Sequence, residues 1–213
     1  MHPRQKIIEL RELLAEKYPQ QEVKTCGAFP TGVEEIDQAL SGGLPQGAIT
    51  EVTSACGGGL LLVSLLQKVE QARAFVALID GRDSFDPATV KKCALRRLLW
   101  VRCHSAELAV KAADLLLRDG NLPLAVLDLR SNTREELRAI PATAWYRLQR
   151  VVEPTATAFL VLTRKSLVSS ARVKLQLEGH FTLDAFAQRQ ADLTKALGAH
   201  ATDVSRIQVR QFA

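Results

Sequence analysis

Short apolar runs alternate with amphipathic stretches along most of the chain. The apolar runs predict buried strands at 75–79, 98–102, 124–127 and 158–162. The stretches between them predict helices, because apolar residues recur there every three or four positions. Strands separated by helices are typical of βαβ units. The pattern therefore predicts an α/β fold with a mostly parallel sheet and helices on both faces.

The two ends of the chain depart from this pattern. Residues 4–18 predict an amphipathic helix that ends at Pro19. Residues 171–178 alternate strictly between apolar and polar, which is typical of an antiparallel strand with one exposed face. A helix is expected at 183–197, and 205–212 alternate again. We therefore predict three parts: an N-terminal helix and linker (1–28), a core (29–170) and a strand–helix–strand extension (171–213).

Composition places the chain among folded proteins. It has 213 residues, of which 47% are hydrophobic and 24% charged, as in a globular domain. Its longest apolar run is far shorter than the roughly 20 residues of a membrane span, and its N-terminus is charged. The four cysteines form no CxxC pair and the histidines are scattered, so no disulfide scaffold or metal site is expected. These features favour a cytoplasmic protein.

Charge is distributed unevenly. The formal net charge is +5, and residues 1–139 hold 18 basic and 18 acidic side chains. Residues 140–213 hold 10 basic and 5 acidic side chains and so account for the whole excess. The last third of the chain is therefore expected to form either a basic face for an acidic partner such as nucleic acid, or an ordinary solvated surface.

A glycine-rich segment at 53–59 lies between a predicted strand at 48–52 and a predicted helix at 60–73. This layout is typical of phosphate binding, which needs the motif Gly-x-x-x-x-Gly-Lys-Ser/Thr for a cation and a magnesium-binding hydroxyl. Here the motif ends in two leucines, which supply neither group, so we predict no nucleotide cofactor and no ATP hydrolysis. The degenerate loop comprises Ser54, Gly57, Gly58, Gly59, Leu60 and Leu61.

The segment before this loop resembles the start of the RecA-family ATPase core. The resemblance rests on Thr31-Gly32-Val33, Ile36-Asp37, Leu40 and the run 42–52, and it extends over about 29–170. It implies a RecA-like fold of the P-loop NTPase class. Four positions acquire an implied role: Leu60 falls on the loop lysine, Leu61 on the magnesium hydroxyl, Arg82 on the catalytic glutamate and Asp128 on the Walker B acid.

A short RecA-like core without a working phosphate loop is similar to the ImuA group of bacterial SOS mutagenesis cassettes. The stretches 98–102, 105–118 and 124–129 and the Arg-rich end of the chain also resemble that group. The resemblance implies a non-catalytic accessory protein of DNA repair and translesion synthesis that acts beside a polymerase-like partner. In RecA proteins an N-terminal helix docks on a neighbouring subunit. The helix at 4–18 is therefore expected to self-associate, bind a partner or fold back on its own core.

The strand at 158–163 resembles the one that leads into the second DNA-binding loop of RecA proteins. Candidate DNA-binding residues follow it: Arg164, Lys165, Arg172, Lys174, Arg206 and Arg210. No aromatic residue lies within 163–174, so a base-stacking platform is absent there. DNA binding is expected to be weak, salt-sensitive and without sequence preference.

Two other functions fit the same residues. SOS-induced cell-division inhibitors also look like shortened RecA cores without a phosphate loop, and they bind a filament-forming cytoskeletal protein. A divergent ATPase would need another cation, such as Lys68 or Arg82, in place of the loop lysine.

Overall fold

The computed structural model describes residues 27–178, 193 and 197–203. The predicted N-terminal helix at 4–18 and the predicted last strand at 205–212 lie outside these residues, as does the predicted helix at 183–197 except for positions 193 and 197. Within the described part of the chain, no helix is both long and apolar enough to cross a membrane.

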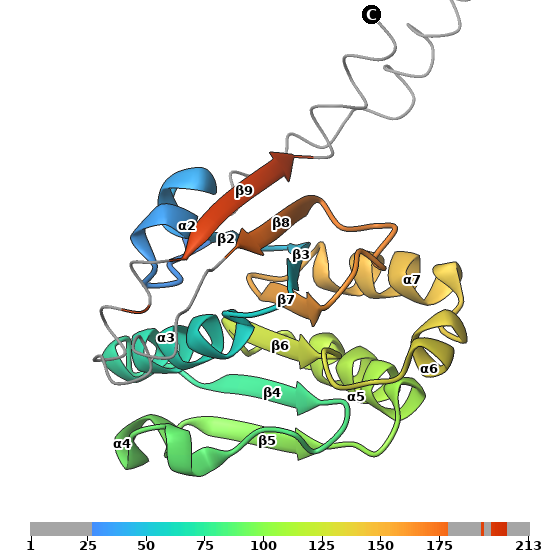
Figure 1. The fold of residues 1–213 in the computed structure, drawn as a ribbon, viewed down its shortest axis with the longest axis horizontal. Coiled ribbons are helices and arrows are strands. Elements are labelled where there is room, and N and C mark those ends of the chain that lie inside the picture. Colours follow the sequence, from blue (N-terminus) through green and yellow to red (C-terminus); the bar gives the residue numbers. More distant parts are fainter. Residues whose placement is uncertain (1–26, 179–192, 194–196, 204–213) are drawn as a thin grey trace, which may run out of the picture.

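A seven-stranded sheet forms the centre of the molecule (Figure 1), with the strand order β5-β4-β6-β7-β3-β8-β9. Every neighbouring pair is parallel except β8 and β9. The strands are β3 (Ala48–Ser54), β4 (Val76–Asp80), β5 (Leu98–Arg102), β6 (Leu124–Asp128), β7 (Ala158–Thr163), β8 (Val173–Glu178) and β9 (Gly198–Asp203). The prediction of a mostly parallel sheet is confirmed. A separate two-stranded ribbon pairs β1 (Ala28–Phe29) with β2 (Leu44–Pro45).

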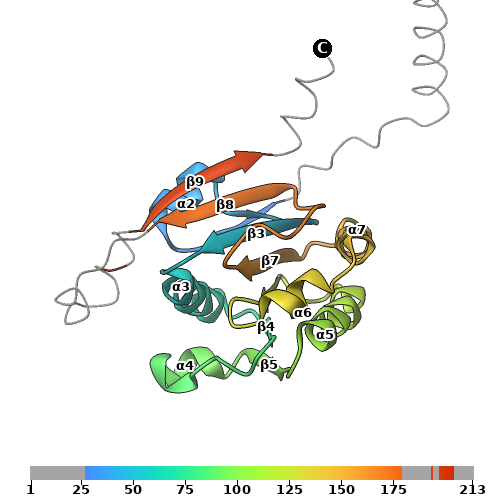
Figure 2. The ribbon, with the colours of Figure 1, turned by 45° about the vertical axis from the view of Figure 1, so that its right-hand side comes forward.

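Helices cover both faces of the sheet and bury two apolar clusters (Figure 2). The helices are α2 (Glu34–Ala39), α3 (Gly58–Gln71), α4 (Lys92–Leu95), α5 (Ala106–Asp119), α6 (Arg134–Arg138) and α7 (Ala142–Val152), with a 3-10 turn at Pro87–Thr89. One cluster lies beneath α3 and includes Leu61, Leu65 and Leu66. The other lies beneath α5 and α7 and includes Trp145 and Leu148.

The strand expected to be antiparallel has two different neighbours. β8 pairs parallel with β3, from Thr50↔Val173 to Ser54↔Leu177, and antiparallel with β9. The antiparallel extension therefore begins one strand later than the alternation indicated. Alternation reports that one face of a strand is covered and the other is not, and this holds here because Leu175 is buried while Gln176 is exposed. Alternation is commoner in antiparallel sheets, but it does not by itself determine the direction of the strand.

Side-chain caps begin α5, α6 and the 3-10 turn. Ser105 Oγ accepts a hydrogen bond from the backbone N–H of Leu108, and Thr133 and Glu136 form a capping box at the start of α6. Asp86 caps the 3-10 turn by accepting from the N–H of Ala88. Each cap satisfies a backbone N–H that the helix itself leaves without a partner.

Candidate functional site

The carboxyl ends of the parallel strands gather the candidate residues at one edge of the sheet, which we call the carboxyl edge. Asp80 at the end of β4 is in register with Asp128 at the end of β6, and Thr53 of β3 is in register with Thr163 of β7. Ligands of open α/β sheets bind at this edge. The structure thus brings the glycine-rich segment, Asp128 and the basic segment after β7 to the same edge.

The glycine-rich segment turns sharply into α3. Gly57 caps the helix with a φ of 92°, a left-handed conformation that glycine adopts without strain. The hydroxyl of Ser54 donates to the carbonyl of Cys56 within the segment. Leu60 is half-buried, whereas Leu61 has no exposed surface and belongs to the core beneath α3. The Leu61 side chain is therefore part of the core and not of the loop surface.

Asp128 forms an ion pair with a residue that the sequence analysis missed. Its carboxylate accepts from Arg130 Nε at 2.9 Å and from Arg130 Nη2 at 2.6 Å, and Asp128 is only 5% exposed. Arg130 Nη1 lies so near Gly58 that a Cβ placed there would be 2.6 Å away. The guanidinium therefore packs against the start of α3, where a phosphate-binding loop would present its backbone. The sequence held one signal for this ion pair, namely an arginine two residues after the aspartate that ends the strand.

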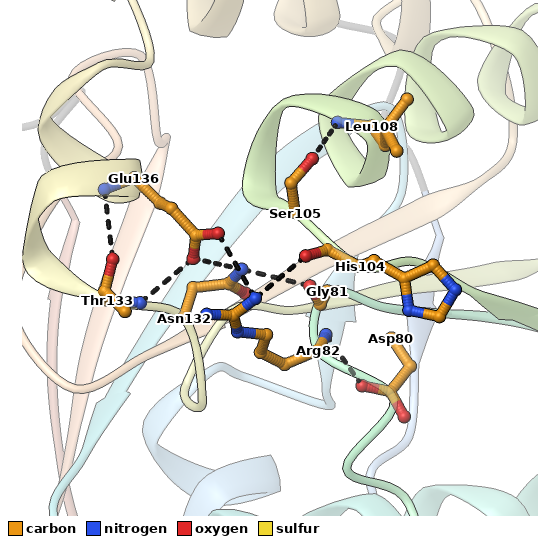
Figure 3. A network of polar contacts seen from close by, with 9 residues as sticks. All are labelled: Asp80, Gly81, Arg82, His104, Ser105, Leu108, Asn132, Thr133 and Glu136. Atoms are coloured by element: carbon orange, nitrogen blue, oxygen red, sulfur yellow. Dashed lines mark hydrogen bonds and ion pairs between the residues drawn. The ribbon is translucent and has the colours of Figure 1, made fainter.

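The position implied for a catalytic glutamate holds an arginine in a structural network (Figure 3). Arg82 Nη1 donates to the carbonyl of His104 at 2.9 Å and lies 3.5 Å from Glu136 Oε1. Asn132 links the same loop to α6 by donating to the carbonyl of Gly81 and to Glu136. The Asn132 amide is the main cause that holds the pKa of Glu136 below its usual value, with the Thr133 N–H and the Arg82 charge adding to it. Arg82 thus ties β4 to α6.

The remaining polar groups near β4 also make structural contacts. The fully buried Asp80 accepts from the N–H of Phe85 at 2.7 Å and from the N–H of Arg82 at 3.3 Å. Asp83 forms two 2.6 Å hydrogen bonds with Arg102, which are the main cause that lowers the pKa of Asp83. Burial raises the pKa of the Cys103 thiol, which argues against a reactive thiolate there. Among residues 27–178, 193 and 197–203, no group of three potential metal ligands gathers.

A buried carboxylate organises the segment after β7. Glu51 of β3 has no exposed surface, and its Oε1 accepts from the backbone N–H groups of Leu167 at 2.5 Å and Val168 at 3.0 Å. Its Oε2 accepts from Ser166 Oγ at 3.0 Å and lies 3.3 Å from Lys174 Nζ. A charge inside a protein needs such partners. Glu51, named in the sequence analysis only as part of the run 42–52, therefore holds this segment in one shape.

The predicted DNA-binding residues fall into three groups. Arg164 and Lys165 are exposed directly after β7, and Arg172 is half-buried. The ammonium group of Lys174 forms an ion pair with Glu51 and donates a hydrogen bond to Ser166, so its charge is already paired within the chain. Arg206 and Arg210 lie outside the described residues.

The sheet order, the glycine-rich segment between β3 and α3, and Asp128 at the end of β6 define the class as an α/β protein with a RecA-like fold. The RecA N-terminal domain family matches residues 13–135, more than half of the chain, and the chain belongs to that family.

The chain is similar to several RecA proteins over about half of its length. Protein RecA of Clavibacter michiganensis subsp. michiganensis is 34% identical over 105 residues, which are 47% of this chain and 29% of that protein. Protein RecA of Cutibacterium acnes is 33% identical over 114 residues, which are 51% and 33% of the two chains. The "DNA repair protein recA homolog 1, chloroplastic" of Arabidopsis thaliana is 29% identical over 104 residues, or 47% and 24%. The match thus spans a third or less of these relatives.

Proposed function

We propose that this protein is a non-catalytic RecA-like protein of DNA repair, which binds DNA and has no ATPase activity of its own. Family membership and the similarity to RecA proteins support the link to DNA repair. The observation that carries the non-catalytic part is the burial of Leu61. The position implied for the magnesium-binding hydroxyl holds an apolar side chain inside the core.

Arg130 supports the same proposal from the other side of the loop. Its guanidinium packs against Gly58 and is held there by two hydrogen bonds to Asp128. The carboxylate implied for magnesium is thereby neutralised within the chain. A phosphate group approaching the start of α3 would have to displace this ion pair, at a cost of about 1–3 kcal/mol for an unpaired buried carboxylate.

The nucleotide part is tested by calorimetry with ATP and magnesium, with Protein RecA of Cutibacterium acnes as the positive control. We expect no heat of binding for this chain. Arg130→Ala opens the space beside Gly58 but restores neither the loop lysine nor its hydroxyl, so it too is expected to show no hydrolysis. ATP turnover that Asp128→Asn abolishes would contradict the proposal and favour a divergent ATPase.

Direct DNA contact is proposed through Arg164 and Lys165. Both are exposed beside β7, on a segment that Glu51 holds in a fixed shape. Fluorescence anisotropy with labelled single-stranded DNA over a salt series is expected to show affinity that falls as salt rises. The double variant R164Q/K165Q should weaken it. R134Q/R138Q, which removes two exposed charges from α6, is the matched control and should have little effect.

Within the RecA-like proteins, we propose that this chain belongs to the ImuA group and acts in the bacterial cytoplasm beside a polymerase-like partner in translesion synthesis. The resemblance of 98–129 and the Arg-rich end of the chain to that group supports the assignment. A polymerase-like gene beside this one, and a complex of the two purified proteins, are the expected findings. An isolated gene whose product binds a cytoskeletal filament protein would favour the cell-division inhibitor instead.

A further inference from the structure

An exposed aromatic ring lies at the opposite edge of the sheet, where β4 and β5 begin. Phe75 directly precedes β4, and 56% of its surface is exposed. The guanidinium carbon of Arg97, just before β5, lies 5.4 Å from the centre of the Phe75 ring. Arg97 is itself fixed, because its Nη1 donates to the carbonyl of Arg73 at 2.8 Å. The ring and the guanidinium therefore form an ordered stack that is open to solvent.

Basic side chains cluster around this stack. Lys92 lies in the single turn of α4, Lys91 and Arg96 flank that turn, and all three side chains are exposed. The turn precedes β5 (Figure 1). Among the described residues, no carboxylate lies within ion-pair distance of any of them, nor of Arg73 or Arg97. We call this set the α4 surface: Arg73, Phe75, Lys91, Lys92, Arg96 and Arg97.

Cations on two helices away from α4 behave differently. Lys111, Arg118 and Arg147 on α5 and α7 each lie within 3.2 Å of a carboxylate oxygen. These three cations are therefore paired with carboxylates of the same chain, whereas the cations of the α4 surface have no such partner among the described residues. The even charge balance of residues 1–139 gave no sign of this local group of cations.

We propose that the α4 surface binds single-stranded nucleic acid. Unpaired cations attract phosphates, and an exposed aromatic ring beside a flat guanidinium offers a face on which a base stacks. An acidic protein would contact the same charges, but it would offer no flat base to stack on the Phe75 ring. The inference rests on the proposed DNA-binding function and adds a contact at the amino-terminal edge of the sheet, away from Arg164 and Lys165. The aromatic group that residues 163–174 lack is present here.

Charge and stacking are tested separately with a labelled oligothymidylate by anisotropy at low salt. K92Q/R96Q is expected to weaken binding about tenfold and to lower the salt slope by about 1.4, since two phosphate contacts are lost and each contributes about 0.7 on a single strand. Phe75→Ala should cost a further factor of about ten, the usual contribution of a stacked base. R134Q/R138Q is the matched charge control. If K92Q/R96Q binds like this control, the inference is wrong.

An exposed thiol on α4 gives a second readout. Cys93 lies in the turn that carries Lys92, whereas the exposed Cys56 lies in the glycine-rich segment at the carboxyl edge. We expect the oligonucleotide to slow alkylation of Cys93 more than that of Cys56, as measured by mass spectrometry of the labelled peptides. Protection of Cys56 alone would overturn the inference.

The outcomes separate this inference from the proposed function. If R164Q/K165Q abolishes binding and K92Q/R96Q does not, the α4 surface is excluded and the proposed function stands. If no oligonucleotide binds at low salt, the DNA-binding proposal itself is wrong. If polyglutamate displaces the oligonucleotide and Phe75→Ala changes nothing, the α4 surface is a site for an acidic protein and the inference is overturned.

Discussion

The two edges of the sheet use charge in opposite ways. At the carboxyl edge, Glu51, Asp80 and Asp128 are almost completely buried, and each is satisfied by groups of the chain itself. At the other edge, the basic side chains around α4 face solvent and have no carboxylate partner among the described residues. Charge at the first edge shapes loops, whereas charge at the second remains available to a ligand.

This difference shows why a charge count is a weak guide to a binding surface. Lys174 belongs to the basic last third of the chain, yet its ammonium group lies 3.3 Å from Glu51. Lys92 belongs to the stretch with no net charge, yet it is exposed and unpaired within the part of the chain that the structure describes. The arrangement of partners, and not the sum of charges, decides which residues can contact a phosphate.

The largest expected effect is at Glu51. Glu51→Ala leaves the ammonium group of Lys174 and two backbone N–H groups without their partner, which should cost about 3–5 kcal/mol of unfolding free energy. Urea denaturation at neutral pH measures it. Glu51→Gln keeps the shape and one acceptor and should cost less, and Lys92→Gln at the other edge should change stability by less than about 0.5 kcal/mol. If Glu51→Ala and Lys92→Gln lowered the unfolding free energy equally, charge would serve the same structural role at both edges and the comparison would be wrong.

Leu61 and Leu60 form a matched pair for the next effect. Leu61→Ala opens a cavity in the core beneath α3 and should destabilise the protein by about 2–5 kcal/mol. The half-buried Leu60 loses less contact, so Leu60→Ala should cost clearly less in the same thermal or urea unfolding assay. A reversed order would mean that Leu60, and not Leu61, anchors the glycine-rich segment.

Arg130 is expected to have a smaller effect. Arg130→Ala leaves the nearly buried carboxylate of Asp128 without its two charged hydrogen bonds, at a cost of about 1–3 kcal/mol. Combining it with Asp128→Asn in a double-mutant cycle measures the coupling between the two side chains. Additive losses would show that the pair is not coupled and that the guanidinium does not neutralise Asp128.

The smallest effect concerns pH and Glu136. Because the folded protein lowers the pKa of Glu136, its contribution to stability is present at neutral pH and is lost as pH falls through that lowered pKa. Glu136→Gln should therefore lower the melting temperature slightly at pH 7, and the difference from the unchanged chain should shrink in acid. Melting curves by circular dichroism at pH 7 and near pH 3.5 test this. A difference that grows in acid would contradict the sign.

The sequence predicted what local chemistry determines. The strand at 158–163 and the helix after the glycine-rich segment both follow from short-range patterns. Strand order and the direction of β8 did not follow, since they depend on pairing between residues more than 100 positions apart. The partners of Glu51 were hidden for the same reason: Leu167 and Val168 meet it only in the folded sheet.

The position of β3 also bears on how the chain acquires its structure during synthesis. Both neighbours of β3 in the sheet, β7 and β8, come from residues 158–178, whereas the family match ends at residue 135. A nascent chain that has emerged only to residue 135 can pair β4 with β5 and β6, but β3 must wait for its neighbours. Such distant pairing slows folding and exposes strand edges in the meantime. The part of the carboxyl edge that β3 and β7 form therefore assembles only after residues 158–178 have been made.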